Sequence, residues 1–138
     1  MTLPSSSSPF QLDFSSIITA SFSLSVVKGN LNLPRSHAKT TDLSASAPNV
    51  AGQTQLIGTT AAGEALVLGD VATNGVAYFI NLDATNYVEI GIQQGGTFYP
   101  LMRLNSGEWA YSRLSQGVTP YARANTSSVV LEYRIFDN

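Results

Sequence analysis

Hydrophobic and polar residues alternate along this chain in short runs, and turn-forming residues separate one run from the next. The pattern is densest between Val76 and Leu114, where each apolar run is interrupted by Asp, Asn, Ser or Gly. Alternation with a period of two is typical of strands, and closely spaced turns are typical of an antiparallel meander. No window keeps a helical period over three turns. The pattern therefore predicts an all-β fold.

The first clear strand is predicted between Ile17 and Val27, and serines occupy its polar face. Four apolar residues share its other face: Ala20, Phe22, Leu24 and Val26. The segment that follows, Arg35–Ala47, is polar and is predicted to be a loop with a short edge strand near Thr41–Ser44. Further along, Asn74-Gly75 predicts a tight hairpin turn, because both residues accept a positive φ.

The run from Val76 to Leu82 is apolar on both faces, which predicts a central strand covered on both sides. One face holds Val76, Tyr78, Ile80 and Leu82, and the other holds Ala77 and Phe79. Pro100 lies in a later strand and has no N–H for a ladder hydrogen bond, so that strand is predicted to be an edge or to carry a bulge.

The last strand is predicted from Ser128 to Phe136, with alternate residues directed inward: Val129, Leu131, Tyr133 and Ile135. About eight to ten short strands at this spacing predict a single antiparallel β-sandwich or jelly-roll-like domain at residues 16–138.

Residues 1–15 precede this domain and are predicted to form an extended N-terminal arm. Ser5 to Ser8 lie between two prolines and offer nothing to bury. The arm is either a frayed terminus or a segment that orders against a neighbouring subunit. In the second case, alternating Phe10, Leu12 and Phe14 would anchor its base.

Charge is sparse in this chain. Charged residues make up 12% of it, against roughly 25% in a typical globular protein, and Ser, Thr, Asn, Gln and Gly replace them. A weakly charged surface lacks the repulsion that keeps many proteins apart, and is therefore compatible with packing against copies of itself. The net charge is −2 and no basic run occurs, so nucleic acid is not an expected partner.

The compartment is indicated only weakly. The chain has no cysteine, which excludes disulfides and thiolate metal sites. No Lys or Arg precedes the first apolar stretch, so a secretory signal peptide is not supported, and no apolar run is long enough for a membrane helix. We expect a protein made in a cytoplasm, with no membrane partner.

The sequence offers no catalytic constellation. His37 is the only histidine and lies in a polar segment without a second ligand type nearby. Asp70, Asp83 and Glu64 could meet around calcium, although the spaced carboxylates of a calcium loop are absent and capping of turns is the simpler interpretation. We expect no enzyme activity, no metal and no cofactor.

Four aromatic residues lie on strands or beside turns, where their polar tips suit half-buried positions: Tyr99, Trp109, Tyr111 and Tyr121. Core or interface positions are one interpretation. The other is a flat row on a sandwich face, which could stack on sugars.

A set of turn and strand residues extends from Leu56 to the C-terminus: Ile57-Gly58-Thr59-Thr60, Glu64-Ala65-Leu66, Leu68-Gly69-Asp70-Val71, Gly75, Asn81-Leu82-Asp83-Ala84-Thr85-Asn86-Tyr87-Val88, Phe98, Gly107-Glu108, Tyr121-Ala122 and Leu131-Glu132-Tyr133. In these residues the chain resembles small structural proteins of tailed bacteriophages. The resemblance implies a β-sandwich virion component present in many copies, with no cofactor and no chemistry. The first third of the chain departs from it.

The sequence therefore leads to a first hypothesis of a phage structural protein, either a capsid decoration or a component of the head, neck or tail. It would be a homo-oligomer that contacts other virion proteins. The expected contact residues are Phe10, Leu12 and Phe14 in the arm, with Tyr99, Trp109 and Tyr121 on the domain. The alternative is a carbohydrate-binding module or receptor-binding domain that uses Trp109, Tyr111 and Tyr121 to bind glycans.

Overall fold

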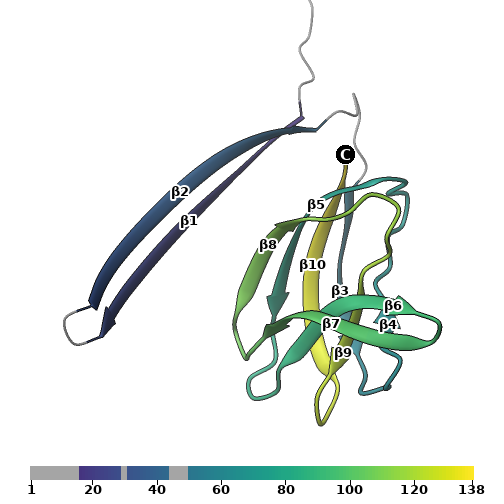
Figure 1. Cartoon of the computed structure of the whole chain (residues 1–138). Helices are drawn as coiled ribbons and strands as arrows, with labels where there is room; N and C mark the ends of the chain where they lie inside the picture. The colour runs from purple at the N-terminus through teal and green to yellow at the C-terminus, as the bar shows by residue number, and fades with distance from the viewer. Residues whose placement is uncertain (1–15, 29–30, 44–49) are drawn as a thin grey trace, which may run out of the picture.

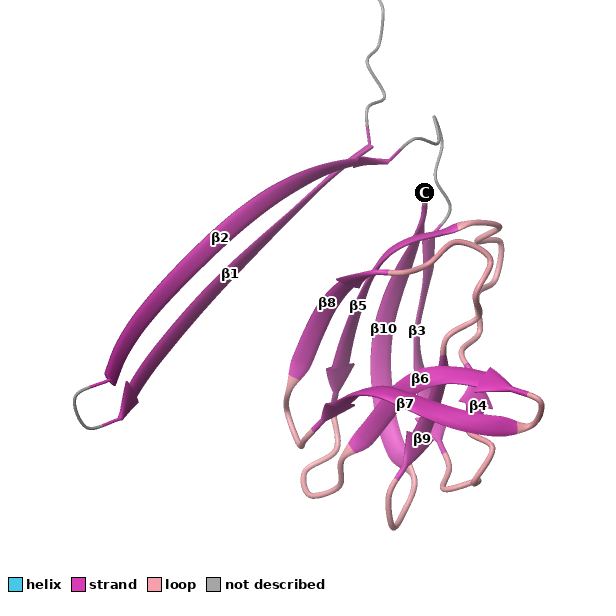
Figure 2. Cartoon of the chain, in the orientation of Figure 1, coloured by secondary structure: helices cyan, strands magenta, loops and turns pink. Residues whose placement is uncertain are grey.

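The computed structural model describes residues 16–28, 31–43 and 50–138 (Figure 1). These residues form ten strands and no helix (Figure 2). Eight strands build two antiparallel sheets of four strands each, arranged as a β-sandwich, which confirms the predicted fold class. The predicted arm at residues 1–15 lies outside the described residues.

One sheet, here called the β10 sheet, has the order β3-β10-β5-β8. Its strands are β3 (Val50–Ile57), β5 (Asn74–Asn81), β8 (Trp109–Arg113) and β10 (Val129–Asp137). The other, the β6 sheet, has the order β4-β9-β6-β7. Its strands are β4 (Glu64–Ala65), β6 (Val88–Gln94), β7 (Thr97–Leu104) and β9 (Tyr121–Ala124). The C-terminal strand β10 therefore pairs with segments about 80 and 55 residues earlier in the chain.

The core lies between the two sheets and follows the predicted alternation. In β10 the residues at odd positions are fully buried: Val129, Leu131, Tyr133 and Ile135. They pack with Phe79 of β5 and with Val88 and Ile90 of β6 in one hydrophobic cluster. Burying each large side chain of this kind contributes about 1.5–3 kcal/mol. Burial raises the pKa of Tyr133 above its usual value, although hydrogen bonds from Gln53 and from the Val67 N–H lower it.

The predicted central position of β5 is confirmed, but the strand begins two residues earlier than predicted. β5 is central, between β10 and β8. Ala77 and Phe79 are buried on its inner face, whereas Tyr78 and Ile80 on the other face are only half-buried. The predicted turn at Asn74-Gly75 is wrong, because both residues belong to the strand. Cross-strand pairing to Asp137 takes precedence over turn preference, and the buried Asn74 amide donates a hydrogen bond to the Val118 carbonyl at 2.5 Å.

Pro100 predicted an edge strand or a β-bulge, and the structure has both. β7 is an edge strand of the β6 sheet, and the register between β6 and β7 shifts between Ile90 and Gly91. Leu101 is the extra residue of this bulge, since Met102 pairs with Ile90 and Pro100 pairs with Gly91. A Cβ atom at Gly91 would collide with the Tyr99 carbonyl oxygen, so the close approach requires glycine.

The remaining two strands, β1 (Ser16–Lys28) and β2 (Leu31–Leu43), form a long antiparallel hairpin. The strand predicted at Ile17–Val27 is confirmed. The predicted loop is wrong from Arg35 to Thr40, because these residues belong to β2, whereas the short edge strand predicted near Thr41–Ser44 is confirmed as far as Leu43. Backbone pairing needs no apolar side chain, so the polar composition of β2 hides it in the sequence. Among the described strands, β1 and β2 pair only with each other and extend away from the sandwich (Figure 1).

Candidate interaction surface

The outward side of the β10 sheet is apolar over much of its area, and we call it the outer face. Six of its large hydrophobic residues are exposed: Val50, Leu56, Leu82, Trp109, Tyr111 and Val130. Leu56 is 64% exposed and Trp109 is 52% exposed. Single exposed hydrophobic residues are ordinary, but a contiguous patch marks a binding site or an interface.

Strand register brings these residues together. Val130 of β10 lies opposite Leu56 of β3, and the Leu82 N–H donates a hydrogen bond to the Val130 carbonyl at 3.0 Å. At the other end of the same strands, Phe136 lies opposite Val50. The residues therefore form cross-strand rows, in which directly opposed side chains touch.

Aromatic residues extend the outer face to its β8 edge. Ile80 of β5 lies opposite Trp109 of β8, and Tyr78 lies opposite Tyr111. The rings of Tyr78 and Trp109 are 6.3 Å apart between centroids and inclined by 36°, within the range of favourable aromatic pairs. Ring contact of this kind holds Trp109 in place and leaves half of its surface open.

Three charged residues lie on the outer face. Glu132 and Arg134 lie near its centre, with a 3.8 Å separation between Arg134 Nη2 and Glu132 Oε1. Arg113 is at the β8 edge and donates a hydrogen bond to the Asn138 side chain at 2.8 Å. Exposed ion pairs of this length contribute little to stability. The apolar residues of the face therefore lie around a weak ion pair.

The hairpin borders one part of this face. Thr19, Ala20 and Ser21 of β1 line a pocket of about 250 Å³ together with outer-face aromatics and Ala77. The aromatic members are Tyr78, Trp109, Tyr111 and Phe136. The next residue of β1, Phe22, is 48% exposed. The hairpin therefore reaches the face at its base, while its large apolar residue at position 22 lies open.

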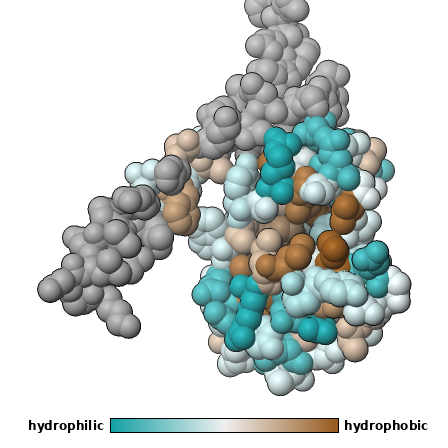
Figure 3. Space-filling model, in the orientation of Figure 1, coloured by the Kyte–Doolittle hydropathy of each residue, from teal (hydrophilic) through white to brown (hydrophobic). Residues whose placement is uncertain are grey.

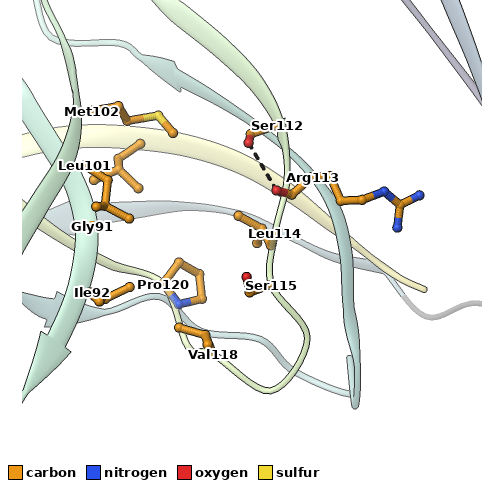
Figure 4. Close-up of a pocket in the computed structure, with 11 residues that line it drawn as sticks. Gly91, Ile92, Leu101, Met102, Ser112, Arg113, Leu114, Ser115, Val118 and Pro120 are labelled. Carbon is orange, nitrogen blue, oxygen red and sulfur yellow. Dashed lines mark hydrogen bonds between the residues drawn. The ribbon is translucent and has the colours of Figure 1, made fainter.

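A second apolar feature is a groove of about 300 Å³ at the open side of the sandwich. Ile92, Leu101 and Met102 line one wall, and Leu114, Val118 and Pro120 line the other (Figure 4). The Arg113 side chain points away from the groove, and only Ser112 and Ser115 bring hydroxyl groups to it (Figure 4). Apolar residues also gather on this side of the sandwich in the space-filling view (Figure 3). The groove can hold an apolar side chain but supplies no acid, base or nucleophile pair.

Two of the carboxylates considered as calcium ligands, Glu64 and Asp83, accept hydrogen bonds in separate turns. Glu64 accepts a hydrogen bond from the Gly58 N–H at 3.0 Å. Asp83 accepts from the backbone N–H groups of Asn86 and Thr85, and these bonds hold the pKa of Asp83 below its usual value of 3.8. Within the described ranges, no three His, Cys, Asp or Glu residues are grouped as a metal site would need.

The lone histidine belongs to the hairpin. His37 lies on β2 opposite Phe22 of β1, and its side chain is outside the described residues. The expectation that His37 has no catalytic role stays a prediction.

The predicted contact residues are dispersed. Phe10, Leu12 and Phe14 lie outside the described residues. Trp109 is on the outer face of the β10 sheet, whereas Tyr99 and Tyr121 belong to the β6 sheet. Tyr99 is 49% exposed on edge strand β7, and Tyr121 is half-buried on β9. Trp109, Tyr111 and Tyr121 therefore do not form one platform, because the third residue belongs to the other sheet.

Sequence reasoning missed Leu56, Val130 and Leu82 as surface residues. The signal was present in the alternation. Val130 lies at an outward position of β10, between the buried residues Val129 and Leu131. Leu56 likewise lies at an outward position of β3. Apolar residues at outward positions of several neighbouring strands indicate a candidate interaction surface, whereas a single one does not.

A scan of the sequence against protein-family models gave no match, and searches of curated proteins and of solved structures gave no significant match. Among the described residues, no helix is long and apolar enough to cross a membrane.

Proposed function

We propose that this chain is a structural component of a tailed-phage virion, a capsid decoration or a head-, neck- or tail-associated protein that acts by self-assembly. It binds copies of itself and other virion proteins through surface contacts. The proposal includes no catalytic step, metal or cofactor.

The observation that carries this proposal is the hairpin. β1 and β2 pair over thirteen residues each, and no other described strand pairs with either of them. An isolated two-stranded hairpin is at best marginally stable in water. Among the described strands, none pairs with the outer edge of β1 or of β2, and strand edges of this kind recruit further strands or packing partners. A chain that carries such an element is built to complete it with another molecule.

Two further observations support assembly. Only 12% of the residues are charged, so copies of the chain repel one another weakly. The outer face of the β10 sheet presents six exposed large hydrophobic residues around the Glu132–Arg134 pair, and exposed apolar residues in such number are typical of interaction sites. The assignment to a virion rests on the resemblance in the turns and strands between Leu56 and the C-terminus.

Two measurements on the full chain test the proposal. Light scattering coupled to size-exclusion chromatography should give at least twice the mass of one chain, which is 14.7 kDa. Mass spectrometry of purified particles from the encoding phage should detect the chain in many copies. A strict monomer that is absent from purified particles would overturn the proposal.

The second candidate is a glycan-binding or receptor-binding domain. It is favoured by Trp109 and Tyr111, which are 52% and 36% exposed on the same face. Exposed aromatic rings of this kind stack on sugars. A glycan array decides this candidate: binding that Trp109→Ala abolishes and Tyr99→Ala keeps would support it. Tyr99 is a matched control, because it is equally exposed but belongs to the other sheet.

A further inference from the structure

We propose that the outer face of the β10 sheet packs against the same face of a second copy, about a two-fold axis that lies between the two sheets and crosses their strands at right angles. The inference rests on the proposed function, since it assumes self-assembly, and it names the surface and the symmetry of one contact. Its support is the order in which charged and apolar residues lie on the face.

Strand register arranges the outer face in rows that cross its strands. One inner row, the arginine row, consists of Gly52, Arg134, Tyr78 and Tyr111. The next inner row, the glutamate row, consists of Thr54, Glu132, Ile80 and Trp109. On β3 and β10 these rows lie between two apolar end rows: Val50 with Phe136, and Leu56 with Val130.

This order is complementary to itself. A two-fold axis that crosses the strands between the two inner rows places each arginine row on the partner's glutamate row. Arg134 then faces the partner's Glu132, and on β8 Tyr111 faces the partner's Trp109. The two apolar end rows face each other in the same way. Every charge of the inner rows meets an opposite charge, and the apolar residues of the end rows meet apolar residues.

The other direction of the axis gives unfavourable contacts. Sheets that stack face to face keep their strands roughly aligned, so the axis runs either across the strands or along them. An axis along the strands places each row on the same row of the partner. Arg134 and Glu132 then meet like charges or apolar side chains, which destabilises an interface. Charge therefore selects the axis that crosses the strands.

The Arg134 side chain lies low on the face. A Cβ atom at Gly52 would collide with it, so this glycine leaves the space in which the arginine lies across β3. Its guanidinium donates a hydrogen bond to the Tyr133 carbonyl at 2.8 Å and is 3.8 Å from the Glu132 carboxylate. An arginine held close to its own sheet leaves room for a second sheet about 10 Å away.

The size of the face sets the strength of the contact. Four strands about 4.8 Å apart, crossed by rows about 6.8 Å apart, give each face roughly 500 Å² in plan. Two faces therefore bury about 1,000 Å², which is near the lower limit for a specific interface. We expect a dimer that dissociates on dilution and that the high local concentration in an assembly would favour.

The base of the hairpin has to give way to the second copy. Thr19, Ala20 and Ser21 line a pocket together with Tyr78 and Trp109 of the inner rows. A second face over these rows occupies that pocket, so pairing shifts the base of the hairpin away from it. The shift breaks no strand pairing with the sandwich, because among the described strands β1 pairs only with β2.

Charge reversal on β10 tests the contact. Glu132→Arg makes arginine face arginine across the axis, and Arg134→Glu makes carboxylate face carboxylate. Sedimentation of a dilution series should show a wild-type dimer at concentrations where each single variant is a monomer. Arg103→Glu is the control and should keep the dimer, because Arg103 is exposed on the other sheet. Circular dichroism melting checks that all three variants remain folded.

Mixing the two β10 variants is the decisive measurement. Positions 132 and 134 of the Glu132→Arg chain face opposite charges in the Arg134→Glu chain. An equal mixture should therefore restore the dimer, and so should both reversals combined in one chain. Single variants that stay dimers, or a mixture that stays monomeric, would overturn the pairing of the faces.

These outcomes separate this inference from the proposed function. A wild-type chain that is a monomer at every concentration and is absent from particles removes both. An oligomer that survives the single reversals, or a monomer that is nevertheless found in particles, removes only the paired faces and leaves the assembly role in place.

Discussion

The two sheets of the sandwich use their outward sides differently. On the β6 sheet, Arg123 pairs with Glu89 at 2.6 Å and its guanidinium lies 4.8 Å from the centre of the Phe98 ring. Arg123 also donates a hydrogen bond to the Ala61 carbonyl, and Gln93 donates one to the Ala62 carbonyl. The turn that includes Ala61 and Ala62 therefore covers part of this face from within the same chain.

The described residues give the outer face of the β10 sheet no comparable cover along most of its length. Leu, Val, Ile and aromatic residues lie there in register around the Glu132–Arg134 pair, and the hairpin borders them at one place. The difference teaches that the described residues cover part of one face from within the chain and leave the apolar residues of the other face exposed. Strand alternation is the same in both sheets, so the two faces differ in which outward residues are apolar.

The largest expected loss of stability compares the core between the sheets with the outer face, through two neighbouring residues of β5. Phe79→Ala removes a fully buried ring and should lower the free energy of unfolding by about 3–5 kcal/mol, because the sheets cannot close over the cavity. Tyr78→Ala, on the half-buried outer side, should cost clearly less. Urea denaturation followed by Trp109 fluorescence measures both. Equal losses would mean that the outer side is packed as tightly as the core.

A smaller effect compares the two faces through their arginines. Arg123→Ala removes an ion pair with Glu89 and the contact with Phe98, and should destabilise the chain by about 1 kcal/mol. Arg134→Ala removes only the looser 3.8 Å pair with Glu132, so a change near zero is expected. Thermal unfolding at low and high salt provides the measurement. The comparison fails if Arg134→Ala is the more damaging change.

The smallest expected effect is a change in melting temperature at acidic pH, and it concerns the turn at Asp83. Hydrogen bonds from Asn86 and Thr85 lower the pKa of Asp83, so its ionised form stabilises the fold above the usual value of 3.8. This contribution is lost as the pH falls through the lowered pKa. Asp83→Asn keeps a side-chain acceptor but cannot ionise. The difference in melting temperature between wild type and variant should therefore be constant near neutral pH and shrink below about pH 4.

Much of the sandwich is predictable from local pattern. The alternation of Val129 to Ile135 identifies the buried strand, and the missing N–H of Pro100 identifies an edge with a bulge. The arm and its aromatic residues stay a prediction, since they lie outside the described residues. The spread of Trp109, Tyr99 and Tyr121 over two sheets could not be predicted, because alternation assigns a residue to a side of its strand but not to a sheet.

The sequence by itself determined that the described part of the chain is all-β, where the first and the last strand lie, and which residues of β10 form the core. Only the tertiary structure decided that Asn74 and Gly75 extend a strand instead of turning, because their partner Asp137 lies over sixty residues away. It likewise decided that polar β2 is a strand, and that Leu56 and Val130 share a face with Trp109. The physical reason is that strand pairing joins distant segments through the backbone, whose hydrogen bonds leave little trace in the side chains.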